Sequence, residues 1–118
     1  MRRVVVAIVI LAALVITGIL ASSTNAEEPT RVRITNGLSR WSIHYVYISS
    51  TSSSSWGDDQ LNSDQVLSPG ASETWTLSAG TYNLRVKDED GDMYTRRGVC
   101  VPRGMLVEWR VTIDDLDR

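Results

Sequence analysis

Apolar side chains recur at every second position over much of the chain after residue 30, which is the period of a β-strand. The segment 81–87 is the clearest case, because an apolar residue occupies each even position from Tyr82 to Val86 and a polar one each odd position. Such alternation predicts a strand with one face in a core and the other in water. Similar patterns predict strands at 31–34, 41–48, 73–77, 93–101 and 107–113.

Segment 41–48 differs from the others because it is apolar on both faces, which predicts a central strand with Ile43, Tyr45 and Tyr47 on one side. Turn residues separate the strands. Asn36-Gly37 is suited to a tight turn with positive φ, and Pro69-Gly70 to a type II turn. Gly98 interrupts the alternation of its segment and predicts a β-bulge. Residues 49–55 are all Ser or Thr and predict a mobile surface loop.

These elements predict an all-β domain, an antiparallel two-sheet sandwich of six or seven strands and of immunoglobulin-like size. A single sheet would leave one face of apolar side chains bare, so a second layer is required. We expect one such domain over residues 27–118, because its length suits one small domain and not two.

The N-terminal 26 residues predict a secretory signal peptide. Arg2 and Arg3 precede the apolar run 4–21, and Ala26 ends a short polar segment with small residues at the cleavage positions. Retention of residues 4–21 as a membrane anchor is the alternative. Both interpretations place the folded domain in the periplasm or outside the cell.

Charge and cysteine content narrow the interpretation further. Residues 27–118 hold 10 Lys and Arg against 14 Asp and Glu, a net charge of −4, so nothing indicates a nucleic-acid partner. Cys100 is the one cysteine, which excludes a disulfide within the chain. We expect its thiol to be a small buried group, with an intermolecular disulfide or a reactive thiol as alternatives.

An ordered series of short motifs gives the chain a family resemblance. It consists of Tyr47-Ile48-Ser49, the serine-rich loop, Trp56-Gly57-Asp58-Asp59, Pro69-Gly70, Gly80-Thr81-Tyr82-Asn83-Leu84-Arg85-Val86 and Asp88-Glu89-Asp90-Gly91. The series resembles a family of small exported bacterial β-domain proteins of unestablished activity, in which the position of Asn83 is more often Asp. Some members carry an argininosuccinate lyase label, but that enzyme is large and helical, so the resemblance implies fold and export only.

The acidic hairpin at 88–92 is a candidate calcium site, because Asp88, Asp90 and Asp92 place carboxylates at alternate positions. The known calcium loop pattern is incomplete, since Gly91 falls at the fourth position and Val99 at the twelfth. A solvated turn is the simpler interpretation. The predicted calcium site is therefore a weak one.

Aromatic residues that border loops give a candidate ligand surface, made of Trp41 and Trp56 with Asp58 and Asp59 beside the latter. Aromatic faces on a secreted sandwich stack against sugar rings, so a glycan is one candidate ligand. The alternative for Trp56 is a plug over the end of the sandwich. Arg31, Arg33, Arg85 and Lys87 would form a basic stripe if their two strands were neighbours.

Catalysis has little support in the sequence. The chain has one histidine, His44, and its place within a predicted strand favours a structural role. No phosphate-binding loop or zinc spacing is present. We therefore expect a non-catalytic binding or structural module whose partner is an envelope protein. A carbohydrate-binding or weak calcium-binding domain is the alternative.

Overall fold

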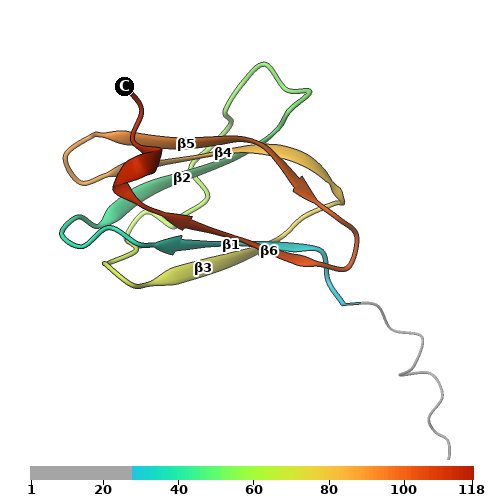
Figure 1. Cartoon of the computed structure of the whole chain (residues 1–118), viewed down its shortest axis with the longest axis horizontal. Coiled ribbons are helices and arrows are strands. Elements are labelled where there is room, and N and C mark those ends of the chain that lie inside the picture. The colour runs from blue at the N-terminus through green and yellow to red at the C-terminus, as the bar shows by residue number, and fades with distance from the viewer. Residues whose placement is uncertain (1–27) are drawn as a thin grey trace, which may run out of the picture.

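The computed structural model describes residues 28–118, which form two β-sheets of three strands each, packed face to face (Figure 1). The predicted signal peptide lies outside the described residues. Among those residues, no helix is long and apolar enough to span a membrane. The strands are β1 (Arg31–Asn36), β2 (Ile43–Ser50), β3 (Ser72–Thr76), β4 (Gly80–Asp88), β5 (Met93–Val101) and β6 (Leu106–Val111), followed by a 3-10 turn, η4 (Ile113–Asp115).

The predicted two-sheet sandwich is confirmed, with one difference in strand direction. One sheet has the order β3-β1-β6 and the other β2-β4-β5, and the two form the lower and upper layers of Figure 1. All pairs are antiparallel except β1 and β6, which run parallel with Val32 opposite Val107. No hairpin joins β1 to β6, because four other strands lie between them in the sequence. Their relative direction is therefore not restricted to antiparallel.

The core lies between the two sheets and contains most of the side chains that the alternation assigns to it. Trp109 and Tyr94 are its largest fully buried members. Trp75, on the edge strand β3, is half-buried. The remaining buried apolar residues are Val32, Ile34, Leu38, Ile43, Val46, Leu61, Leu67, Leu84, Val86, Val101 and Val111.

Strand β2 shows the main error in the predicted side-chain directions. A β-bulge between Ile43 and Tyr45 adds one residue to β2 relative to β4, so the alternation changes phase there. Ile43 and Val46 are buried, whereas Tyr45 lies on the outer surface. The prediction that Ile43, Tyr45 and Tyr47 share a face is therefore wrong, and the bulge places both tyrosines outside.

Asn36-Gly37 is not the predicted tight turn. Asn36 ends β1 fully buried, and its amide nitrogen donates to the carbonyl oxygens of Trp41 and Leu67, both at 2.8 Å. Its amide oxygen accepts from the Leu38 N–H at 2.8 Å. Gly37 is needed for space, since a Cβ there would lie 2.5 Å from the carbonyl oxygen of Val111. Asn36 and Gly37 therefore hold the loop after β1 against the body of the sandwich.

Two glycine predictions are confirmed. Gly70 has φ of 89°, and the Ala71 N–H donates to the Ser68 carbonyl oxygen at 2.8 Å, as a type II turn requires. Gly98 has φ of 69° and lies at the register shift between β4 and β5.

Cys100 is exposed, so the expectation of a buried thiol is wrong. Its neighbours Val99 and Val101 face inward, and alternation turns its thiol outward, opposite Thr81.

Two irregular segments cover the edges of the β2-β4-β5 sheet. Beside β2, the loop 58–67 adds a bridge between Leu67 and Ile43 and a hydrogen bond from the Gln60 N–H to the Val46 carbonyl oxygen. Beside β5, the C-terminal tail adds a bridge between Leu116 and Tyr94. Covered edges resist further strand pairing. The outer face of this sheet therefore remains its main accessible surface.

Candidate binding face

The outer face of the β2-β4-β5 sheet gathers aromatic and basic side chains. Alternation turns Tyr45 and Tyr47 of β2 outward, opposite Lys87 and Arg85 of β4 respectively. The loop residue Trp56 and Arg97 of β5 complete the set. We call the six residues Tyr45, Tyr47, Trp56, Arg85, Lys87 and Arg97 the contact face.

The two tyrosines form the first half of the contact face. Their rings are stacked in parallel, 6.4 Å apart between centroids, and the Lys87 ammonium lies 5.1 Å from the Tyr45 ring centroid. Tyr45 is 41% exposed. Burial and the nearby Asp59 carboxylate raise the pKa of the Tyr47 hydroxyl above its ordinary value. The Tyr47 phenol is therefore neutral at physiological pH, and both rings offer apolar surface with a hydroxyl.

Trp56 and two arginines form the second half. The guanidinium carbon of Arg85 lies 4.4 Å from the Trp56 ring centroid, and that of Arg97 lies 5.4 Å from it. Arg85 also donates to the Thr95 hydroxyl at 2.9 Å and pairs with the Asp117 carboxylate at 3.5 Å. Trp56 therefore rests on the outer face of the sheet. It does not plug the end of the sandwich, as one interpretation of the sequence expected.

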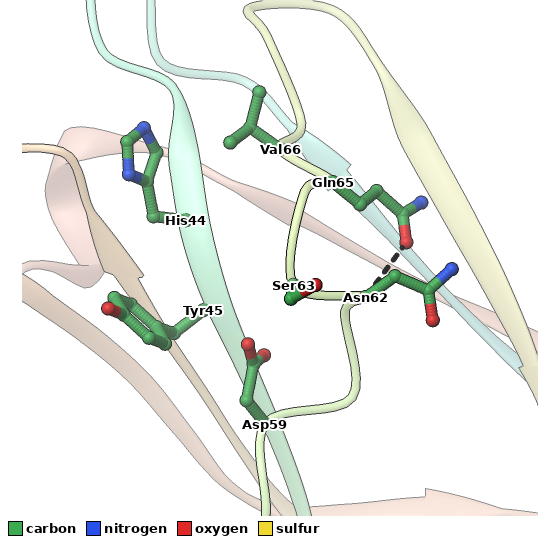
Figure 2. Close-up of a pocket in the computed structure, with 7 residues that line it drawn as sticks. All are labelled: His44, Tyr45, Asp59, Asn62, Ser63, Gln65 and Val66. Carbon is green, nitrogen blue, oxygen red and sulfur yellow. Dashed lines mark hydrogen bonds between the residues drawn. The ribbon is translucent and has the colours of Figure 1, made fainter.

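A hollow of about 350 Å³ lies beside Tyr45, between β2 and the loop 58–67 (Figure 2). We call it the tyrosine hollow. Figure 2 shows His44 and Tyr45 on the strand and the other lining residues on the loop. The Gln65 side chain accepts from the Asn62 N–H at 3.2 Å and donates to the Glu73 carboxylate at 3.1 Å. The lining is His44, Tyr45, Asp59, Asn62, Ser63, Gln65 and Val66.

Asp59 is a structural element of the tyrosine hollow. One carboxylate oxygen accepts from the Val46 N–H at 2.9 Å and from the Leu61 N–H at 3.1 Å. These bonds join the loop to the edge of β2 at the bulge. The predicted surface residue Asp59 therefore holds the hollow in shape, and its carboxylate gives that hollow a negative charge. Asp58, its exposed neighbour, does not line the hollow.

His44, Asp59 and Ser63 line the same hollow, although they do not form a catalytic triad. No hydrogen bond joins His44 to either of the other two within the described residues, and the His44 ring points away from Asp59 (Figure 2). A serine nucleophile needs a base within hydrogen-bond reach. His44 is exposed at the bulge. It is therefore not the satisfied histidine of a strand interior that the sequence favours.

A second hollow, of about 220 Å³, lies beside Trp56 and the serine-rich loop. We call it the serine hollow. The Ser49 hydroxyl donates to the Ser55 carbonyl oxygen at 2.7 Å, and the Gly57 N–H donates to the Ser55 hydroxyl at 3.0 Å. These bonds give the loop a defined path across the outer face. The lining is Ser49, Ser53, Ser54, Ser55, Trp56, Asn83 and Arg97.

The acidic hairpin turns its first carboxylate inward. Asp88 is 2% exposed and accepts hydrogen bonds from the N–H groups of Asp90 and Asp92, at 2.9 and 3.0 Å, and from the Tyr94 hydroxyl at 2.8 Å. Within residues 28–118, no three His, Cys, Asp or Glu side chains are grouped to hold a metal ion. The structure therefore does not bring Asp88, Asp90 and Asp92 together as calcium ligands.

Trp41, in the loop between β1 and β2, contacts this hairpin and lies outside the contact face. Its indole N–H donates to the Asp90 carboxylate at 2.9 Å, and its ring packs on the core. Trp41 and Trp56 therefore do not form one surface. The predicted basic stripe is also absent, because Arg31 and Arg33 lie on β1 in one sheet whereas Arg85 and Lys87 lie on β4 in the other.

Comparisons with known proteins add no relative: no family model, no curated protein and no solved structure matches the chain. The contact face escapes sequence reasoning because its members come from three separate strands and a loop. Two signals were nevertheless present. Arg85 and Lys87 stand at outward positions of the most regular strand, and Trp56 directly follows the serine-rich loop.

Proposed function

We propose that the protein is a non-catalytic binding module of the periplasm or cell exterior and that the contact face is its binding surface. The observation that carries the proposal is the gathering of tyrosine, tryptophan and unburied cations on one sheet face, flanked by two hollows. Tyrosine, tryptophan and arginine are the residues enriched where proteins contact partners, because they combine large apolar area with polar groups.

The opposite outer face is less suited to recognition. There β1 and β3 turn arginine and threonine side chains to solvent, and Arg33 donates to the Thr74 hydroxyl at 3.3 Å. Within the described residues, no aromatic ring stacking and no cation–π contact lies on that face. The resemblance to a family of exported bacterial β-domain proteins supports the proposed location outside the cytoplasm and says nothing about the ligand.

Capture from an extract of the cell envelope tests the proposal. The immobilised protein should retain an envelope component, and a Tyr45→Ala, Arg97→Ala double variant should lose it. A Thr76→Ala, Arg110→Ala variant of the opposite sheet is the matched control and should retain it. Equal retention by all three proteins, or no retained component, contradicts the proposal. The melting temperatures of the variants show whether each still folds.

A carbohydrate ligand is the second candidate, favoured by the tyrosine hollow. An exposed tyrosine ring beside amide, hydroxyl and carboxylate groups offers a stacking surface with polar groups around it, as sugar rings require. Affinity electrophoresis in neutral polysaccharide gels tests this candidate. Retardation that Tyr45→Ala abolishes supports it, and the same mobility with and without polysaccharide contradicts it.

A further inference from the structure

We infer that the serine hollow is a binding site for an oxyanion group, such as a phosphate, a sulfate or the carboxylate of a sugar acid. This inference rests on the proposed binding function, because the hollow forms one end of the contact face. Its lining offers a guanidinium, a carboxamide and several hydroxyls, and it includes no carboxylate. A small concave site with several donors and no acidic group suits an acceptor-rich, negatively charged ligand.

Arg97 supplies the positive charge and is not committed to another ligand. Within residues 28–118, no carboxylate lies in ion-pair distance of Arg97, whereas Arg85 pairs with Asp117 and Arg96 with Asp115. Its guanidinium lies over the Trp56 ring. This contact holds the guanidinium over the contact face and leaves its N–H groups to bind an anion in the forked geometry that oxyanions accept.

Asn83 presents a donor to the same hollow. Its side-chain oxygen accepts from the Gly98 N–H at 3.0 Å, at the bulge that Gly98 creates in β5. This bond fixes the orientation of the carboxamide. The NH₂ group has no hydrogen-bond partner in the described part of the chain, so it remains available to a ligand in the hollow.

The serine-rich loop completes the site with hydroxyl groups. Its bonds among Ser49, Ser53 and Ser55 shape the wall of the hollow before any ligand binds. The Ser54 hydroxyl lines the hollow and has no partner among residues 28–118. A wall formed in advance lowers the conformational entropy lost on binding.

The two hollows differ in charge and so predict selectivity. The tyrosine hollow contains the Asp59 carboxylate, which repels anions, whereas the serine hollow contains Arg97. The domain from residue 27 onward carries a net charge of −4, so a positive hollow is a local exception. Its attraction for an anion should weaken as ionic strength rises, because the site is open to solvent.

Nuclear magnetic resonance titration of the protein with three added ligands tests the inference. Inorganic phosphate and galacturonate should shift the Trp56 indole N–H, the Asn83 side-chain amide and the Gly98 amide in a saturable manner. Galactose, which lacks the charge, should not. A tighter dissociation constant for galacturonate than for phosphate identifies a sugar acid as the source of the anion, and the reverse order identifies free phosphate.

Three variants locate the effect. Arg97→Gln should weaken binding at least about tenfold (about 1.4 kcal/mol), and Asn83→Asp should also weaken it while keeping the oxygen that accepts from Gly98. Arg110→Gln removes the same charge from the other sheet and should leave binding unchanged. The inference fails if galactose binds as tightly as galacturonate, if no anion binds, or if Arg97→Gln has no effect. The envelope capture experiment can still succeed in each of these cases.

Discussion

The buried carboxylate of Asp88 gives the sharpest prediction about stability. Asp88 ends β4 and accepts three hydrogen bonds, two from N–H groups of its own hairpin and one from the hydroxyl of Tyr94. Tyr94 is 1% exposed, so no water can easily replace its acceptor. Asp88→Ala removes all three bonds and leaves the tyrosine hydroxyl buried without a partner.

The expected cost follows from the donors. A hydrogen bond to a charged group contributes about 1.5–3 kcal/mol to stability. Loss of the bond to Tyr94 should cost this full amount. Loss of the bonds to the two hairpin N–H groups should cost less, because water can partly reach those groups. We therefore expect Asp88→Ala to lower the free energy of unfolding by about 3–5 kcal/mol, and Tyr94→Phe by about 1.5–3 kcal/mol. The total free energy of unfolding of a small domain is roughly 5–15 kcal/mol.

Urea denaturation followed by circular dichroism measures these differences, and the double variant measures the coupling between the two side chains. The sum of the losses in unfolding free energy of the two single variants should exceed the loss of the double variant by about 1.5–3 kcal/mol. Asp92→Ala, which removes an exposed carboxylate of the same hairpin that has no hydrogen-bond partner within residues 28–118, is the control and should cost less than about 1 kcal/mol. If Asp88→Ala does not fold, Asp88→Asn keeps the acceptor for the hairpin. Additive effects, or a loss below about 1 kcal/mol for Asp88→Ala, refute the reasoning.

Three further predictions concern pH, packing and the thiol. Burial and the bond to Asp88 raise the pKa of Tyr94 above its ordinary 10.0, so above pH 10 the unfolded chain loses this proton before the folded one and stability falls as pH rises. The melting temperature of Tyr94→Phe should fall less steeply there, and parallel curves contradict the assignment. Gly37→Ala should cost about 1–3 kcal/mol in urea denaturation, because the new methyl group meets the carbonyl oxygen of Val111, and an unchanged midpoint contradicts this. Cys100 is exposed, so a maleimide should label the native protein as fast as the urea-unfolded one, and protection until unfolding would show a buried thiol.

Regular alternation made much of the fold predictable. Strand β4 follows its pattern from Tyr82 to Val86 without a break, and Gly98 marks the bulge in β5. The bulge in β2 has no such marker, because His44 and Tyr45 are both plausible strand residues. Asn36 was misread for a related reason: its buried hydrogen bonds reach Trp41 and Leu67, and no local pattern reveals contacts across that loop.

The candidate site was less predictable than the fold because it depends on the bulge and on loop paths. Without the phase change in β2, Tyr45 and Tyr47 would be assigned to the core. Trp56 was singled out correctly as a loop residue near the surface, but its contacts with Arg85 and Arg97 join segments up to 41 positions apart. In the C-terminal tail, which shows no apolar alternation, Asp115 accepts from the indole N–H of Trp109, a contact that no local pattern reveals.

Footprinting in the native cell envelope tests the central claim most directly. Hydroxyl radicals oxidise exposed aromatic side chains, and mass spectrometry compares their rates in the envelope with those in the isolated protein. The account predicts that Tyr45 and Trp56 are protected in the envelope, while Thr76 and Arg110, on the opposite sheet, mark peptides that react at unchanged rates. Protection confined to the β3-β1-β6 sheet, or equal rates for Tyr45 and Trp56 in both samples, would contradict it.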